Sequence, residues 1–210
     1  MGIISDIQPQ KRNRQRVNIY VDGQYAFSLT TTAAVGLKVG QPVTDALLAQ
    51  LQDQEEIEKA RLAAEQFLSF RPRSIAEVRQ NLVQKAFPEP VIEQTINHLQ
   101  ERHLLDDLAF ARYWLEQRES FKPRSALALR QELHQKGLDR HLIEAVLADL
   151  DEMTSARRAA EKLVPRWSHL PWAAFQQKMG SFLQRRGFSY DTARQVTAAI
   201  WADLTTNELE

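Results

Sequence analysis

The 210-residue sequence contains no cysteine, only seven glycines and no long apolar run. The lack of cysteine excludes disulfide bonds, thiolate metal sites and cysteine nucleophiles, and it fits a reducing compartment. No stretch approaches the roughly 18 apolar residues of a membrane span, and the beginning of the sequence has no apolar signal core. We therefore expect a cytoplasmic protein that has no membrane partner.

Positive and negative charges balance, with 27 Lys and Arg against 27 Asp and Glu. A net charge of zero at first argues against a nucleic acid as partner, but the charges are unevenly placed. Residues 45–58 contain five acidic residues and no basic one, whereas residues 157–186 contain seven basic residues and Glu161 as the only acid. Such segregation can give a neutral protein a basic face, although solvated helix faces would produce the same pattern.

One sequence motif occurs twice. The segment FRPRS at residues 70–74 returns as FKPRS at 121–125, and nine of the sixteen positions in 70–85 and 121–136 are identical. A fixed period of about 50 residues is typical of stacked repeats. In each copy the spacing of apolar residues predicts three helices, and a third, degenerate copy follows. We predict a mainly α fold of three tandem three-helix repeats in an elongated curved array, covering residues 53–104, 105–152 and 153–210.

The first segment, residues 1–52, has a different pattern. Residues 17–21 and 25–29 alternate apolar and polar side chains around an Asp-Gly pair, which is the strongest short signal for a β-hairpin. A lone hairpin is marginal in water, so we expect it to pack on a neighbour. A short helix over residues 30–36 and a helix from Thr44 to Leu51 complete this predicted N-terminal cap.

Capping residues predict where the repeat helices begin. Ser74 with Glu77 forms a capping box pattern, and Ser125 occupies the same place in the second repeat. Gly137 supplies a left-handed helix end in the second repeat, whereas Ala86 stands there in the first, so that turn is either different or slightly strained. In the third repeat we predict helices over residues 156–167, 175–186 and 192–204.

No catalytic constellation emerges from the sequence. It has no Gly-rich phosphate loop, no His-Glu-x-x-His and no nucleophile elbow. The acidic pair Asp106-Asp107 is better explained as a helix cap than as a metal site. Trp114 and Trp201 are assigned to the core, and Trp172 is left open between core packing and base stacking. We expect neither an enzyme nor a bound metal or cofactor.

The two repeat motifs place cations directly before helix starts, where the helix dipole disfavours them. Amide groups at a helix start with flanking arginines could bind a phosphate or an acidic side chain. The alternative is an inherited motif that only sets a turn. The candidate contact residues are Arg71, Arg73, Arg79, Lys85, Lys122, Arg124, Arg130, Lys136, Arg185 and Arg186.

Three further features carry a family resemblance over almost the whole chain. They are the pattern F-x-P-R-S-x-x-x-[VL]-R-x-x-L at 70–82 and 121–133, the segment LLDDLAFA at 104–111, and NIYVDGQYAFS at 18–28. The chain resembles the RecX family of bacterial recombination regulators. The departures are Ala86 and the weak third repeat, whose role is therefore the most open.

The resemblance implies a non-enzymatic, monomeric modulator of the RecA recombinase. Such proteins bind along the groove of the RecA filament on DNA and suppress its ATPase, strand-exchange and co-protease activities. The partners would be the RecA filament and DNA, contacted directly or through the filament. Two other hypotheses stay open: a direct DNA-binding module, which predicts a steep salt dependence, and a helical-repeat scaffold for peptides.

Overall fold

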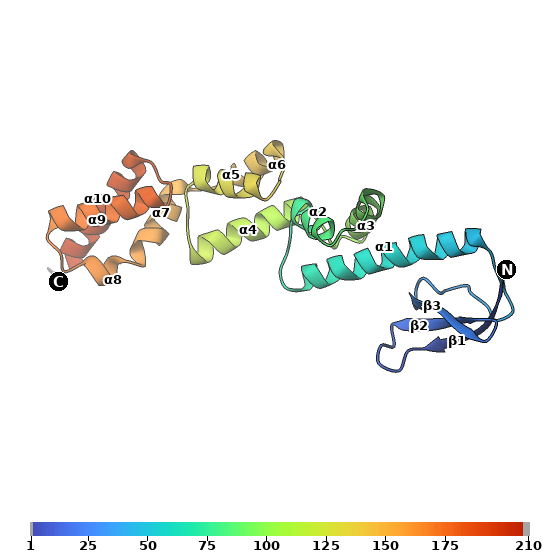
Figure 1. The fold of residues 1–210 in the computed structure, drawn as a ribbon. Coiled ribbons are helices and arrows are strands. Elements are labelled where there is room, and N and C mark those ends of the chain that lie inside the picture. The colour runs from blue at the N-terminus through green and yellow to red at the C-terminus, as the bar shows by residue number, and fades with distance from the viewer. Residues whose placement is uncertain (1, 208–210) are drawn as a thin grey trace. The chain divides into compact units, whose positions relative to one another are not determined.

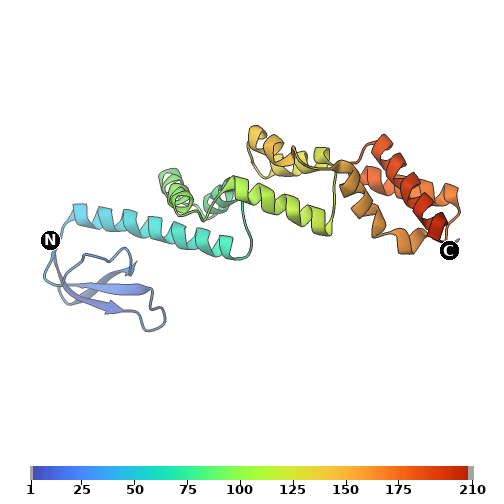
Figure 2. The ribbon, with the colours of Figure 1, turned by 180° about the vertical axis from the view of Figure 1, so that it is seen from behind.

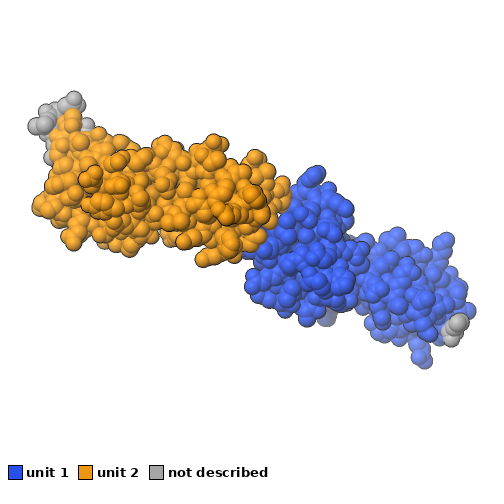
Figure 3. All heavy atoms as spheres, turned by 90° about the horizontal axis from the view of Figure 1, so that it is seen from above, with its two compact units in different colours: residues 1–105 blue, residues 106–210 orange. Residues whose placement is uncertain are grey.

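The computed structural model describes residues 2–207, which form four strands and ten helices. The chain divides into two compact units, one ending at Leu105 and the other beginning at Asp106 (Figure 3). The first unit holds the sheet and the first three-helix repeat, and the second unit holds the other two repeats (Figure 1). The predicted mainly α fold of three-helix repeats behind a small β segment is confirmed.

The N-terminal sheet has four antiparallel strands in the order β3-β2-β1-β4. They are β1 (Gly2–Pro9), β2 (Arg16–Val21), β3 (Gln24–Thr30) and β4 (Pro42–Val43). Asp22 and Gly23, with φ of 49° and 82°, form the tight turn of the predicted hairpin. β1 provides the neighbour that the hairpin needs. Apolar and polar residues do not alternate regularly along β1, because its pairing register with β2 shifts between Ile4 and Asp6.

Two predictions for this segment are wrong. Residues 31–36 form turns rather than a helix. The helix after Thr44 does not end at Leu51, because α1 runs without a break over Asp45–Ser69. Buried Glu55 explains this continuity, since it accepts a hydrogen bond from the Thr30 amide (2.6 Å) and pairs with Arg16 (2.9 Å). The predicted boundary between the N-terminal cap and the first repeat therefore falls inside one helix, which lies against the sheet (Figure 2).

Repeat 1 consists of the second half of α1, α2 (Ile75–Gln84) and α3 (Glu89–Glu101). The capping box of Ser74 and Glu77 is present as predicted. Ala86 has a φ of 61°, so the turn is the same left-handed one that Gly137 forms in repeat 2. A residue with a Cβ is strained there by about 1 kcal/mol. The helices enclose a core of Ala60, Ala64, Val78, Leu82, Ile92, Ile96, Leu99 and Leu105.

Repeat 2 consists of α4 (Asp107–Phe121), α5 (Ala126–Gln135) and α6 (Arg140–Leu147). Asp106 accepts hydrogen bonds from the amides of Leu108 (2.7 Å) and Ala109 (3.2 Å), which confirms that it is a helix cap. Ser125 caps α5 in the same way. The buried residues of this repeat are Phe110, Ala111, Leu129, Leu133, Leu138, Ile143 and Leu147.

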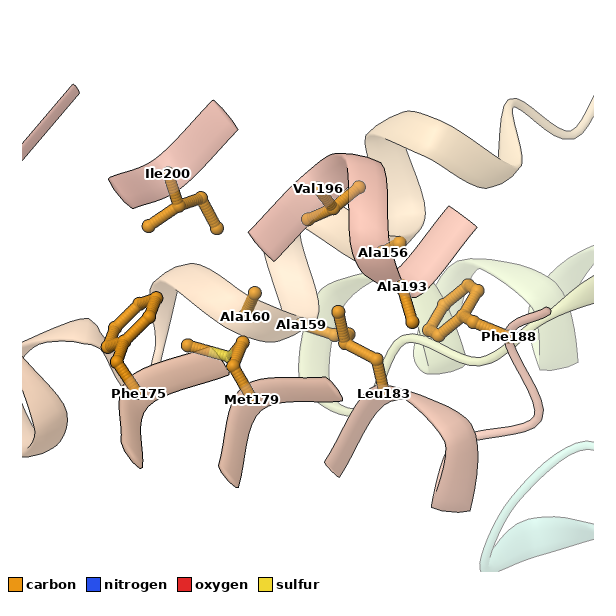
Figure 4. Close-up of a cluster of buried hydrophobic side chains, with 10 residues drawn as sticks. All are labelled: Ala156, Ala159, Ala160, Phe175, Met179, Leu183, Phe188, Ala193, Val196 and Ile200. Atoms are coloured by element: carbon orange, nitrogen blue, oxygen red, sulfur yellow. The ribbon is translucent and has the colours of Figure 1, made fainter. Parts of the chain in front are cut away.

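Repeat 3 consists of α7 (Glu152–Glu161), α8 (Val164–Trp167), α9 (Trp172–Arg185) and α10 (Tyr190–Asn207). The single helix predicted over 156–167 is wrong, because α7 ends at Glu161 and a separate short helix begins at Val164 with Pro165 in its first turn, where a proline is tolerated. α9 starts at Trp172, whose ring lies 5.4 Å from that of Trp201. The residue is also 37% exposed, so core packing and base stacking both stay open for Trp172. Figure 4 shows the core between α7, α9 and α10.

Repeats 2 and 3 are joined at the repeated motif. The Ser125 amide donates to the Arg186 carbonyl (3.3 Å), and the Ala126 amide donates to Glu152 of α7 (2.7 Å). A Cβ built on Gly187 would lie 2.6 Å from the Ser125 Oγ. The start of α5 is thus packed against repeat 3. No helix in residues 2–207 is long and apolar enough to cross a membrane.

Candidate functional site

The structure gathers three arginines where repeats 2 and 3 meet. Arg118 lies in the last turn of α4, Arg124 directly precedes the cap of α5, and Arg186 caps the end of α9. We call these three residues the arginine cluster. Arg124 and Arg186 were candidates from the sequence, whereas Arg118 was not.

One carboxylate serves two members of the cluster. Glu132 of α5 accepts a hydrogen bond from Arg118 Nε at 2.7 Å and lies 2.9 Å from Arg124 Nη1. The same carboxylate also accepts from the indole N–H of Trp114 at 2.8 Å. Three donors therefore share one group, and Glu132 has little capacity left for the third arginine.

Aromatic rings support the cations. The guanidinium of Arg118 lies 4.5 Å from the centroid of the Trp114 ring, and the ammonium of Lys136 lies 5.1 Å from the same ring. Arg186 lies 5.0 Å over Phe182. Cation–π contacts of this kind contribute about 0.5–1 kcal/mol at exposed sites. The sequence candidate Lys136 is thus brought beside the arginine cluster, and Trp114 acts as a platform as well as a core residue.

The arginine cluster carries more positive charge than its surroundings neutralise. Burial lowers the pKa of Arg186, and the nearby charges of Arg124 and Arg118 lower it further. Two buried guanidinium nitrogens, Arg124 Nε and Arg186 Nη1, have no hydrogen-bond partner among the described residues. Buried donors without partners are costly. Because the Arg124 side chain is still 30% exposed, an incoming anion can reach the cluster and relieve this excess charge.

Repeat 1 uses the same motif differently. Arg71 pairs with Glu77 at 2.9 Å, and Arg73 stacks over the ring of Phe67 at 4.0 Å. Burial and then the charge of Arg71 lower the pKa of Arg73. Position 67 of repeat 1 corresponds to Arg118 of repeat 2, so an aromatic ring stands where the second copy has a third arginine. The motif in repeat 1 is therefore engaged within the protein.

The helix starts themselves are occupied by carboxylates of this chain. Glu77 completes the capping box of α2, and Glu152 accepts from the first amide of α5. The predicted binding of a partner's phosphate or acidic side chain at these helix starts stays a prediction, because the acids found there belong to this chain.

The other candidate cations fall into two groups. Arg79 pairs with Glu89 and with Glu93 (2.6 Å), and Arg130 forms two hydrogen bonds with Glu144 (2.6 and 2.8 Å) that raise the pKa of Arg130. Within residues 2–207, no ion pair is found for three exposed cations: Lys85, Lys122 and Arg185. The structure does not bring these five residues into the arginine cluster.

No sequence signal pointed to Arg118. It lies fourteen residues from Glu132, on another helix, and its place in the first repeat is held by Phe67. Within the described part of the chain no group of three or more His, Cys, Asp or Glu residues is arranged to hold a metal ion.

Four family models match the chain in order. Their descriptions are the regulatory protein RecX N-terminal domain (residues 2–44) and the first, second and third RecX three-helix domains (60–99, 106–147 and 151–197). The third model covers the repeat that is degenerate in sequence, so that repeat is recognised as part of the same architecture.

Curated relatives and solved structures agree with these matches. The regulatory protein RecX of Halalkalibacterium halodurans is 32% identical over 95% of this chain and 79% of its own length, and that of Bacillus subtilis is 33% identical over 91% and 74%. A crystal structure of regulatory protein RecX is similar with a TM-score of 0.74 and 26% identity, covering 94% of this chain and all of that one. RecX from Lactobacillus salivarius has a TM-score of 0.59 and 26% identity over 69% of this chain and 96% of its own. The chain therefore belongs to the RecX family of regulatory proteins.

Proposed function

We propose that the protein is a negative regulator of the RecA recombinase and that the arginine cluster contacts an anionic group on the RecA–DNA filament. The regulator would bind in the filament groove and inhibit the ATPase, strand-exchange and co-protease activities. Family membership supports the regulatory role. The observation that carries the contact site is the excess of charge there: three guanidinium groups meet beside the single carboxylate of Glu132, and the Arg124 side chain is 30% exposed.

The chemistry of the cluster favours a compact anion. Guanidinium groups bind carboxylates and phosphates through paired, charge-assisted hydrogen bonds. A filament groove offers both kinds of group, as acidic side chains of RecA and as phosphates of DNA. Lys136 adds a further positive charge at the cluster, and the exposed Lys85, Lys122 and Arg185 would contribute weaker, screened attraction.

The test is an inhibition assay with a variant that spares the fold. The side chain of Arg186 forms no ion pair in the described residues, so Arg186→Gln removes positive charge without freeing a buried carboxylate. Loss of one charge-assisted contact of about 1.5–3 kcal/mol predicts at least a roughly tenfold higher concentration for half-inhibition of RecA's DNA-dependent ATPase. The assay is run at two salt concentrations with protein well below one copy per RecA.

The matched control is Arg157→Gln. Arg157 also lies in repeat 3, but Glu161 (2.9 Å) and Asp203 (2.6 Å) already neutralise it. We expect this variant to inhibit like the parent protein. Equal potency of Arg186→Gln and Arg157→Gln, with both variants folded by circular dichroism, would refute the assignment of the contact site. Failure of the parent protein to inhibit RecA would refute the proposed function itself.

A further inference from the structure

Repeats 2 and 3 have a hollow at the same place, between their second and third helices. In repeat 2 the hollow has a volume of about 680 Å³, and the residues that line it include Arg130, His134, Arg140 and Glu144. In repeat 3 the volume is about 330 Å³ between α9 and α10. Both values lie within the range of small-ligand sites, about 300–1,000 Å³. We call the second hollow the α9–α10 groove.

The three repeats can be compared position by position by counting from the left-handed turn residue of each one. Seven residues before Ala86 and Gly137 stand Arg79 and Arg130, and seven residues after them stand Glu93 and Glu144. These residues form the ion pairs Arg79–Glu93 and Arg130–Glu144, which link the second helix of each repeat to the third. In two of the three repeats an arginine–glutamate ion pair, which we call the clamp, therefore links the second helix to the third at this position.

Repeat 3 has lost the clamp. Counted in the same way from Gly187, the two positions hold Gly180 and Arg194. A Cβ built on Gly180 would meet nothing within 4 Å, so the space that the arginine side chain would occupy stays open. In repeat 3 the arginine is on the third helix instead of the second. Arg194 forms no ion pair or side-chain hydrogen bond in residues 2–207.

The charge of the helix pair has changed accordingly. Residues 126–147 of repeat 2 contain three Lys or Arg and three Asp or Glu, whereas residues 172–207 of repeat 3 contain four basic residues and two acidic ones. One of the two acids, Asp203, is paired with Arg157 of α7. Asp191, in the first turn of α10, is the other, and it forms no ion pair among the described residues. Among the described residues that line the α9–α10 groove, Arg194 is the one charged side chain, so the groove carries one positive charge and no acid.

The remaining lining is neutral and rich in hydrogen-bonding groups. It offers amide, hydroxyl and phenol groups from Gln176, Gln177, Ser181, Gln184 and Tyr190. Amide side chains supply both donors and acceptors, as base edges require. Tyr190 is 67% exposed at the rim, where its ring is available for stacking. A peptide backbone can pair with the same amides, so the feature that favours a nucleotide is the exposed ring of Tyr190 beside the cation of Arg194.

We propose that the α9–α10 groove binds a nucleotide of an unpaired DNA strand. Arg194 holds the phosphate, the glutamine amides contact the base edge, and the base stacks on Tyr190. A duplex keeps its bases stacked inside, so only a single strand offers a free base together with its phosphate. This deepens the proposed function, because it names DNA rather than RecA as the group that repeat 3 contacts, and it is testable without RecA.

The experiment measures binding of the full chain to a fluorescent oligothymidine by anisotropy at several salt concentrations. Arg194→Gln is expected to raise Kd about tenfold and to reduce the salt slope by about 0.7, the value for one phosphate contact on a single strand. Gly180→Glu is expected to have a similar effect, because the new carboxylate can pair with Arg194 and rebuild a clamp. Arg130→Gln in repeat 2 is the matched control and should change Kd less than twofold.

An abasic oligonucleotide of the same length separates base from phosphate recognition. It should bind the parent protein several-fold more weakly than oligothymidine, and Tyr190→Leu should abolish that difference. The inference is overturned if the parent protein does not bind the strand, or if Arg194→Gln and Gly180→Glu bind it as the parent does. It is also overturned if these variants lose RecA inhibition but keep strand binding, since the occupant would then be an acidic protein segment. Strand binding that depends on Arg194, in a protein that fails to inhibit RecA, would refute the proposed function and support this inference.

Discussion

Repeats 2 and 3 share a backbone plan and differ in the charges they place on it. In both, a left-handed glycine, Gly137 or Gly187, ends the second helix, and the residue two positions later, Asp139 or Ser189, caps the third helix. In repeat 2 the Arg130–Glu144 pair spans the hollow between the second and third helices, whereas the smaller hollow of repeat 3 has Arg194 without an ion pair among the described residues. The comparison teaches that the turn, the caps and the apolar stripe maintain the three-helix unit, while the surface between two helices is free to change.

Both repeats contribute residues to the arginine cluster at their junction. Repeat 2 contributes Arg118, Arg124 and the shared carboxylate of Glu132, and repeat 3 contributes Arg186. Neither repeat forms the arginine cluster alone. A small residue at Gly187 makes this possible, because it lets the end of α9 approach the cap of α5.

The largest expected effect comes from breaking that approach. Gly187→Ala combines a left-handed residue with a Cβ 2.6 Å from the Ser125 Oγ. Strain of about 1–2 kcal/mol and overpacking of about 1–3 kcal/mol predict that the free energy of unfolding falls by about 2–4 kcal/mol. Urea denaturation measures this. Gly137→Ala shares the backbone term of about 1–2 kcal/mol, because Gly137 has a φ of 79°, and we expect its loss to be the smaller of the two. Equal losses in the two variants would contradict the close packing at Gly187.

An intermediate effect is expected when the cluster loses its carboxylate. Glu132→Gln leaves Arg118 and Arg124 without their ion-pair partner and replaces one of two acceptor oxygens by a donor, so stability should fall by about 1–3 kcal/mol. Added phosphate should restore part of the melting temperature, because the anion takes the place of the carboxylate. Glu161→Gln is the control, because it removes one of the two exposed ion pairs of Arg157 and leaves the pair with Asp203. We expect its melting temperature to fall by no more than about a degree and to show no response to phosphate.

The smallest effect sharpens the comparison of the two hollows. The double substitution Arg130→Gly with Glu144→Arg gives repeat 2 the pattern of repeat 3. We expect stability to fall by about 1 kcal/mol, mostly from glycine in a helix, and affinity for oligothymidine to rise two- to fivefold. The mechanism is an unpaired arginine beside an open hollow. If the affinity for the strand stays the same while the protein remains folded, the arginine needs the amide lining of repeat 3 to bind.

Much of the fold was predictable because the decisive signals are local. The Asp22-Gly23 turn, the Ser74–Glu77 capping box and the period of the repeated motif each depend on residues close together in sequence. The predicted helix end at Leu51 was wrong because contacts with residues distant in sequence determine where that helix ends. The polar stretch after Leu51 stays helical because Glu55 contacts Arg16 and Thr30 in the sheet.

The candidate site was only partly predictable for the same reason. Ten cations were named from the repeated motif and the basic segments, but their partners were not evident. Arg71, Arg79 and Arg130 turn out to be paired within the protein, while Arg124 and Arg186 meet Arg118 from three separate elements. An ion pair between residues that lie far apart in sequence, on different helices, cannot be predicted from a single sequence.

By itself, then, the sequence determined the three-helix unit, its repetition and the residues that begin and end its helices, because capping, turn conformation and apolar periodicity act over a few residues. Only the tertiary structure decided which positive charges are neutralised and which are not. That outcome depends on how the end of α9 packs on the start of α5 and on which side chains face one another across α9 and α10. Electrostatic free energy falls off with distance in space rather than with separation along the chain.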